Sequence, residues 1–203
     1  LEELALTQKE AFLAKDPGIP REIGTERLVK TNAIVVITGI RRSGKSTLMR
    51  QLAGGYSDFL YINFDDERLM DFTLEDFSSL MLVFEKTSPG VRTLFIDEIQ
   101  NVPGWERFVR RIHDEGYKVF LTGSNANLLS AELGTRLTGR YATITLFPFS
   151  FREVLRFRSV DTRKITAKTK AAILAEFDRY LAGGGFPDYL KFEDPDYLRR
   201  IYD

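Results

Sequence analysis

Five short runs along the chain are apolar or β-branched at nearly every position. They do not alternate between apolar and polar residues, which is typical of strands that are covered on both faces of a parallel sheet. These runs predict strands at 33–38, 59–64, 93–97, 118–122 and 142–147.

Stretches with apolar residues at helical spacing separate these strands. In WERFVRRIHDEG (105–116), an apolar stripe runs from Trp105 to Ile112, and Gly116 supplies a stop. Further helices are expected over 1–15, 45–53, 73–86 and 126–133. Because strands alternate with helices, the pattern predicts an α/β fold with a parallel sheet.

The pattern changes near Pro148, after which it is helical to the end apart from GGGFP (183–187). We therefore expect a core over 1–148, which includes an N-terminal helical segment, and a helical unit over 149–203. The chain begins with Leu1 rather than methionine, and DPDYLRRIYD (194–203) resembles a helix in progress. These ends suggest a fragment that stops before a C-terminal region.

Composition excludes several classes of protein. The 29 basic and 29 acidic residues cancel, so the chain is not a bulk polyanion binder. Residues 152–170 carry seven basic against two acidic side chains, which indicates either weak nucleic-acid contact or a solvated face. The absence of cysteine excludes disulfides and thiol catalysis. No run approaches the ~18 apolar residues of a membrane span and no signal peptide opens the chain, so we expect a cytoplasmic protein.

The segment GIRRSGKS (39–46) matches the phosphate-binding pattern G-x-x-x-x-G-K-[ST] and lies between a predicted strand and a predicted helix. Its glycines allow a tight turn with inward N–H groups, Lys45 would reach the β- and γ-phosphates, and Ser46 would bind magnesium. The alternative is a glycine turn with a surface lysine. Arg41 and Arg42 would brace the phosphates or a neighbouring carboxylate, and we expect at least one of them to face solvent only. The predicted phosphate-site residues are Gly39, Arg41, Arg42, Ser43, Gly44, Lys45, Ser46 and Thr47.

Two carboxylates end the third predicted strand, in LFIDEIQ (94–100). Asp97 would hold magnesium through water, and Glu98 would polarise a water for attack on the γ-phosphate. The alternative is a pair of surface carboxylates at a strand end. No Asn-Lys-x-Asp segment is present to recognise guanine, which favours ATP over GTP.

Two further polar positions are candidates for catalysis. Asn125 or Ser124, in LTGSNA (121–126), would orient the attacking water, or would cap the helix that follows. Of the two we favour Asn125. Arg140 precedes the last predicted strand and would act as an arginine finger on a neighbouring subunit, the alternative being a surface arginine.

Together these segments resemble the AAA+ ATPases, in particular the prokaryotic and archaeal group related to STAND NTPases and Orc/Cdc6 initiators. The narrower marks are GRYATITLFPFSFREVL (139–155) and GGFPDYL (184–190). The resemblance implies a P-loop sheet of strand order 5-1-4-3-2 with helices on both faces and a small helical lid. It also implies an adenine pocket walled by Ile19, Pro20 and Pro187, although a proline-fixed turn explains both segments equally well. No lid arginine that would couple hydrolysis to lid motion is evident.

The sequence thus predicts a magnesium-dependent ATPase domain, with ATP and Mg²⁺ as cofactors, that works as a homo-oligomer on DNA or a protein partner through a missing C-terminal region. One alternative is a nucleotide-switched binding module with little turnover. Another is a small-molecule kinase, against which Glu98 beside Asp97 argues, since that pair favours water as the acceptor. What such an ATPase acts on is not encoded in these motifs.

Overall fold

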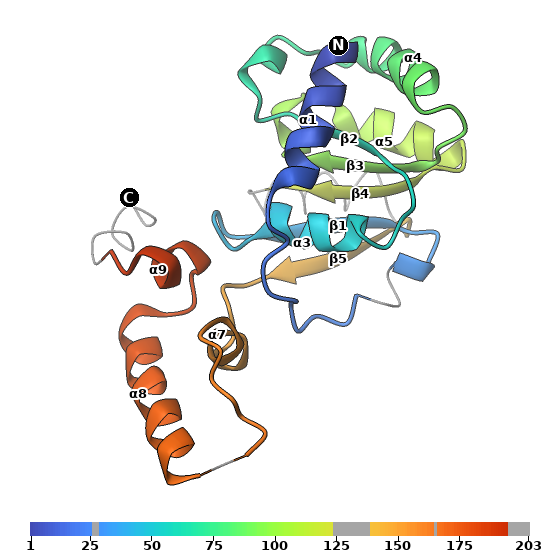
Figure 1. The fold of residues 1–203 in the computed structure, drawn as a ribbon. Helices are drawn as coiled ribbons and strands as arrows, with labels where there is room; N and C mark the ends of the chain where they lie inside the picture. The colour runs from blue at the N-terminus through green and yellow to red at the C-terminus, as the bar shows by residue number, and fades with distance from the viewer. Residues whose placement is uncertain (26–28, 124–138, 165, 195–203) are drawn as a thin grey trace.

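The computed structural model describes residues 1–25, 29–123, 139–164 and 166–194 (Figure 1). Its helices and strands follow the predicted order along the chain. They are α1 (Glu2–Ala14), β1 (Ile34–Gly39), α3 (Lys45–Ala53), β2 (Leu60–Asn63), η1 (Glu67–Leu69), α4 (Asp76–Thr87), β3 (Thr93–Asp97), η2 (Ile99–Asn101), α5 (Trp105–Asp114), β4 (Lys118–Thr122), β5 (Tyr141–Leu146), α7 (Phe151–Phe157), α8 (Ala167–Gly183) and α9 (Pro187–Phe192). The helix predicted at 126–133 lies outside the described residues.

The strands form one parallel sheet in the order β2-β3-β4-β1-β5. This is the predicted order read from the opposite edge, so the predicted fold class is confirmed. Each strand differs from its predicted range by no more than one residue at either end. Because all strands run the same way, the C-terminal ends of β1, β3 and β4 lie together, and Gly39, Asp97 and Thr122 lie there. We call this end of the strands the carboxyl edge of the sheet.

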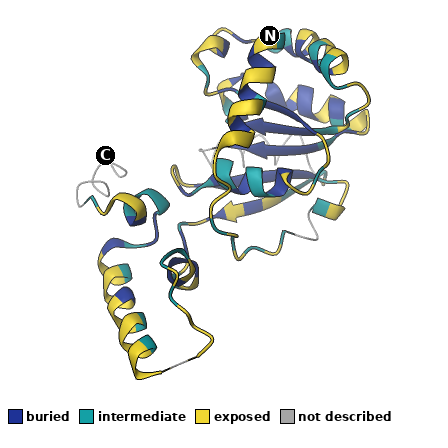
Figure 2. Cartoon of the chain, viewed as in Figure 1, coloured by how far each residue is buried: buried dark blue, intermediate teal, exposed yellow. Residues whose placement is uncertain are grey.

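Both faces of the sheet are covered by helices, as the unbroken apolar runs require. Alternate residues of each strand point to opposite faces. One set packs against Leu48, Met49 and Leu52 of α3, and the other packs against α4 and α5. Figure 2 shows β1 to β4 buried between these layers, whereas the edge strand β5 is partly exposed. The first set includes Val35, Ile37, Tyr61, Phe95 and Phe120, and the second includes Ile34, Val36, Ile62, Leu94, Ile96, Val119 and Leu121.

Helix α1 covers the β2 edge of the sheet. The Gln8 side-chain amide donates to the backbone oxygen of Asn63 (3.1 Å) and accepts from its N–H (2.8 Å), so it replaces a neighbouring strand at this point. Phe12, one turn further, stacks on Tyr61 with ring centroids 4.0 Å apart. The helix thereby satisfies an edge that would otherwise offer unpaired backbone groups.

The chain turns from β5 into α7 through residues 147–150, and α7 to α9 lie beyond the β5 edge (Figure 1). Phe149, Val154 and Leu190 form a small core here, against which Ile19 of the N-terminal segment also packs. Gly185 fits because a Cβ at this position would stand 2.0 Å from the backbone oxygen of Phe149. Within the described residues, no helix combines the length and the apolar character that crossing a membrane demands.

Candidate functional site

The loop between β1 and α3 is built around two glycines. A Cβ on Gly39, at φ +143°, would lie 2.1 Å from the backbone oxygen of Leu146 on β5, so only glycine lets the two strands close up here. Gly44 adopts φ 93° immediately before α3, which aims the N-terminus of that helix at the loop. The predicted strand–loop–helix context of this segment is therefore present.

Lys45 is the first residue of α3, directly after the loop, and is only 5% exposed. Its ammonium donates to the backbone oxygens of Gly39 (3.2 Å) and Ile40 (3.1 Å). Burial lowers the pKa of Lys45, while the nearby charges of Glu98 and Asp97 raise it. The buried ammonium is thus hydrogen-bonded to neutral backbone oxygens, which a more strongly attracted anionic ligand can replace.

Asp97 ends β3 and is 3% exposed. Burial and the nearby Glu98 raise its pKa, whereas hydrogen bonds from Thr122, Ser46 and Tyr61 lower it, and the raising effect is larger. The Tyr61 hydroxyl lies 3.4 Å from Oδ2 of Asp97. This carboxylate is therefore held by hydroxyl groups from α3, β2 and β4, and it stands next to the Ser46 hydroxyl.

Glu98 follows in the left-handed region, at φ 52° and ψ 45°, which is rare for a residue with a side chain. Such a conformation costs about 1 kcal/mol or more and needs surrounding contacts to persist. Its N–H donates to the Thr122 hydroxyl (3.0 Å), and its carboxylate accepts from the Gln100 amide at 2.5 Å. The turn sends Glu98 into the cleft beside the loop.

Thr122 connects both carboxylate positions, a role that the sequence analysis missed. Its hydroxyl donates to Asp97 and accepts from the backbone of Glu98, and the residue is fully buried. The sequence does contain a signal, because Thr122 is a polar residue that directly follows the apolar run Val119–Leu121 at the end of a predicted strand. The predicted Ser124 and Asn125 lie outside the described residues.

A cleft of about 460 Å³ opens over the loop, within the size range of small-molecule sites. One end is charged and polar, and the other is apolar and formed by Ile19, Phe149, Phe157 and Pro187. The charged end contains Arg41, Arg42, Gly44, Lys45, Ser46, Thr47 and Glu98, and the charged residues Asp16, Arg21, Asp188 and Lys191 also line the cleft. The structure therefore brings most of the predicted phosphate-site residues and two of the three predicted adenine-pocket residues to one cleft.

Several predicted residues lie elsewhere. Gly39 and Ser43 form the buried back of the loop rather than the cleft lining, and Pro20 is exposed, its backbone oxygen accepting from Arg156. Arg140 lies at the N-terminal ends of the strands, opposite the carboxyl edge, where it pairs with Asp114 at the end of α5. Nothing in this placement brings Arg140 to the loop of its own chain.

Helix α9 contributes two cleft residues that the sequence analysis did not anticipate, Asp188 and Lys191. Their i,i+3 spacing after Pro187 was the available signal, since it places both on one face of a helix. The basic block at 152–170 is less free than its composition indicates. Its arginines pair with carboxylates: Arg152 and Arg156 with Glu22, Arg158 with Glu176 and Glu193, and Arg163 with Asp161.

Some known proteins are similar to this chain in sequence, and others are similar in fold. Uncharacterized protein MJ1544 of Methanocaldococcus jannaschii is 36% identical over 173 residues, which cover 84% of this chain and 39% of that protein. An uncharacterized protein of Haemophilus influenzae is 35% identical over 193 residues, covering 87% of this chain and 46% of its own length. The chain thus spans less than half the length of these relatives.

Among solved structures, the ADP complex of Saccharomyces cerevisiae Hsp104 is similar with a TM-score of 0.57, at 19% identity over 90% of this chain and 31% of that one. This likeness concerns the fold alone. The sequence model of the AAA domain matches residues 31–155, which run from just before β1 to α7 and include the loop, Asp97, Glu98 and Thr122. The chain therefore belongs to the AAA domain family of AAA+ P-loop proteins.

Proposed function

We propose that this domain binds ATP with Mg²⁺ in the cleft and hydrolyses its terminal phosphate. One observation carries the proposal: Lys45, Ser46 and Glu98 line a cleft at the carboxyl edge of the sheet that also has apolar lining residues, and the buried Asp97 lies behind Ser46, which hydrogen-bonds it. Ligands of open α/β sheets bind at this edge. The family membership supports nucleotide binding, and the geometry supplies the roles of the residues.

The triphosphate would lie in the loop, where backbone N–H groups and the N-terminus of α3 attract anions. The Lys45 ammonium would exchange its bonds to two backbone oxygens for phosphate oxygens. Since phosphate charge favours the protonated lysine, binding would raise the pKa that burial lowers.

The Ser46 hydroxyl and the Asp97 carboxylate fit a magnesium ion, because this ion prefers oxygen ligands and is bound in proteins by few side chains plus phosphates and water. Bound magnesium would neutralise charge on the phosphates. Glu98 would accept the proton of the attacking water. The hydrogen bonds of Thr122 would fix the position of Asp97 relative to Glu98. The apolar end would receive adenine between Ile19, Phe149, Phe157 and Pro187.

We further propose that residues 149–194 act as a lid over the core, because α9 places Asp188 and Lys191 in the cleft lining. In that reading the boundary lies near Pro148, at the end of β5. Arg140 would serve the nucleotide of a neighbouring subunit, since its own loop lies at the other edge of the sheet.

A nucleotide-switched module with little turnover is a second candidate, favoured by one contact. The Gln100 amide lies 2.5 Å from the Glu98 carboxylate, which occupies an oxygen that a catalytic base needs. If this bond persists with ATP bound, the domain would hold nucleotide and cleave it slowly. Release of phosphate under single-turnover conditions separates the two candidates.

The test compares the parent with Lys45→Ala and Glu98→Gln. It measures ATP binding by calorimetry and phosphate release in the presence of Mg²⁺ or EDTA. Lys45→Ala should weaken ATP binding by at least tenfold, because the charge that meets the phosphates is lost. Glu98→Gln should bind ATP as the parent does and lose turnover by about 10²-fold or more. Surface changes of the same type, Lys168→Ala and Glu75→Gln, serve as controls. Unchanged ATP affinity in Lys45→Ala would refute the phosphate site, and parental turnover in Glu98→Gln would refute the base.

A further inference from the structure

Arg21 lies in the segment that follows α1, and its guanidinium is buried between three parts of the chain. Its side chain is 6% exposed and that of Glu153, its ion-pair partner on α7, is 4% exposed, with Nε and Oε1 2.8 Å apart. A buried ion pair is expensive unless further hydrogen bonds complete it. Here the completing bonds lead directly to the phosphate loop.

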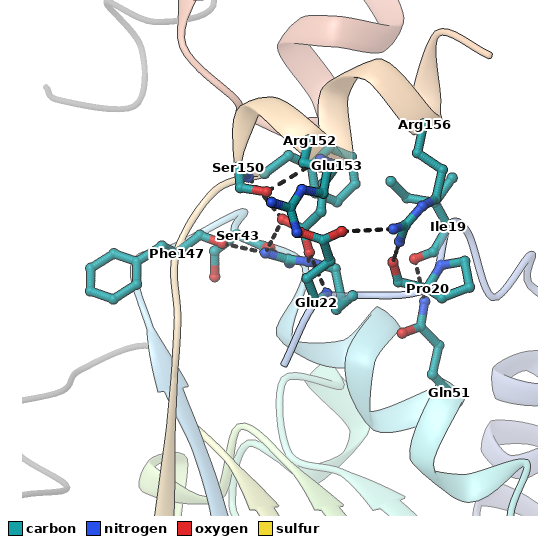
Figure 3. Close-up of polar contacts among 12 residues, drawn as sticks. Ile19, Pro20, Glu22, Ser43, Gln51, Phe147, Ser150, Arg152, Glu153 and Arg156 are labelled. Carbon is teal, nitrogen blue, oxygen red and sulfur yellow. Dashed lines mark hydrogen bonds and ion pairs between the residues drawn. The ribbon is translucent and has the colours of Figure 1, made fainter. Parts of the chain in front are cut away.

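An arginine has five N–H groups. For Arg21, Nε and one terminal nitrogen bond the two oxygens of Glu153, at 2.8 and 3.4 Å. The same terminal nitrogen donates to the backbone oxygen of Phe147 (2.7 Å), just after β5. The other donates to the backbone oxygen of Ser43 (3.1 Å), inside the loop. Figure 3 shows Ser43, Ser150 and Glu153 close together, with the ring of Phe147 pointing away from them.

Glu153 is fixed as firmly as its partner. It accepts from the backbone N–H of Glu22 (2.8 Å) and of Ser150 (2.8 Å), the second bond belonging to the capping box that begins α7. Although burial alone would raise the pKa of Glu153, the hydrogen bonds from Arg21 and these N–H groups lower it. The pair is therefore a charged joint rather than a neutral contact.

The remaining face of Arg21 rests on the lid. The guanidinium stands 4.9 Å from the ring centroid of Phe149, whose N–H donates to the backbone oxygen of Gly185 (2.7 Å) between α8 and α9. The Tyr180 hydroxyl of α8 also bonds the backbone oxygen of Phe149 (3.1 Å). A continuous set of contacts thus runs from α8 and the turn between α8 and α9 through Phe149 and Arg21 to Ser43.

We propose that Arg21, which lines the cleft, is a positioning residue for the phosphate loop: with Glu153 it holds the back of the loop against α7, and so sets triphosphate affinity through the loop. The proposal rests on the nucleotide binding proposed above. Its reasons are that four N–H groups of Arg21 already have protein acceptors, and that the bonded oxygen of Ser43 belongs to the loop whose N–H groups must face the phosphates.

The experiment measures the affinity of the whole chain for Mg–ATP and for inorganic tripolyphosphate, which has no base. Arg21→Gln should weaken both by the same factor, roughly tenfold, as happens when a group that orients a ligand-binding element is removed. Arg21→Lys keeps the charge but cannot form the fork, and should give an intermediate loss. Arg21 and Glu153 act as one unit, so their effects should not add. The double variant Arg21→Gln/Glu153→Gln should have an affinity within about twofold of that of the weaker-binding single variant.

Arg156→Gln is the matched control. This arginine also ties the N-terminal segment to α7, through the Pro20 oxygen (2.9 Å) and the Glu22 carboxylate (2.7 Å), but these two partners lie outside the loop. It should leave both affinities within about twofold of the parent. Thermal melts confirm that each variant is folded at the assay temperature, and Arg21→Lys replaces Arg21→Gln if the latter is not.

The outcomes separate cleanly. Loss of ATP affinity with unchanged tripolyphosphate affinity would show that Arg21 contacts the nucleoside, and would overturn positioning. Unchanged affinities in folded Arg21 variants would make the pair structural only. If the parent binds neither ligand, the proposed function fails and this inference with it; if the parent binds both and Lys45→Ala does not, the function stands whatever Arg21 does.

Discussion

At the scale of single residues, the site concentrates groups that are unfavourable for folding. The backbone of Glu98 is in the left-handed region. Asp97 and Lys45 carry ionisable groups that are almost fully buried, with 3% and 5% exposure. Strain and buried charge of this kind persist at functional sites because the surrounding structure compensates for them. Removing one of them should therefore stabilise the empty domain.

Asp97→Asn should show this. The amide keeps the size of the side chain and removes a charge whose burial raises the pKa of Asp97. At pH 7 we expect the free energy of unfolding to rise by about 1 kcal/mol, which corresponds to roughly 2–4 °C in Tm for a domain of this size. The same variant should lose the additional Tm that Mg–ATP gives the parent. Asp71→Asn, at an exposed position, is the control, and a lower Tm for Asp97→Asn would contradict the account.

At the scale of elements, the joint between the N-terminal segment and α7 depends on local signals and one distant pairing. The capping box of Ser150 and Glu153 begins α7, and the same Glu153 side chain accepts from Glu22. One carboxylate therefore both caps a helix and anchors a segment 131 residues away. This dual use explains why Glu153 is buried on a helix that is otherwise partly exposed.

The acid stability of the domain should reflect this carboxylate. A carboxyl whose pKa is lower in the folded than in the unfolded chain stabilises the fold above its unfolded pKa, and this contribution is lost as pH falls through the folded pKa. Glu153 is such a group. At pH 7, Glu153→Gln should cost about 2 kcal/mol or more, because Arg21 then lacks its counter-charge. The difference from the parent should begin to shrink near pH 4, where a glutamate in the unfolded chain becomes protonated, and should continue to shrink as pH falls through the lowered folded pKa of Glu153.

Urea unfolding of both proteins between pH 7 and pH 3 measures this narrowing. Glu75→Gln, at an exposed position of the same residue type, should show a small and pH-independent difference. A constant gap between Glu153→Gln and the parent down to pH 3 would mean that the charge of Glu153 contributes nothing.

At the scale of the whole molecule, the parallel sheet separates the two candidate catalytic regions. The loop and both carboxylates lie at the carboxyl edge, whereas Arg140 lies where β5 begins, opposite Ile34. Five residue steps along β1 separate these edges, about 16 Å. An arginine side chain cannot cover that distance within one chain, so a catalytic Arg140 requires a second subunit.

Mixing variants tests this arrangement. Arg140→Ala should bind ATP normally and turn over slowly, because an arginine finger contributes about 10³-fold or more. Lys45→Ala subunits, which keep Arg140 but lack the phosphate site, should restore part of the activity when mixed with Arg140→Ala subunits. Parental activity should also rise faster than linearly with protein concentration. If associated mixtures stay inactive, Arg140 is only the structural partner of Asp114.

The sequence alone determined the local parts of this protein. The strands were predictable because burial on both faces leaves uninterrupted apolar runs, and Lys45, Ser46, Asp97 and Glu98 were identifiable because each motif is contiguous and sits at a strand end. Strand order was different in kind: alternation of strands and helices is compatible with many orders, and the correct one came from the family resemblance, which the sheet confirms.

Tertiary structure decided the contacts between distant segments. The Arg21–Glu153 pair joins residues 132 positions apart, Thr122 bonds Asp97 across neighbouring strands, and Lys191 reaches the cleft from α9. It also placed Arg140 at the far edge of the sheet. None of these follows from periodicity, because strand register and helix packing set which side chains meet, and these depend on the whole core closing at once.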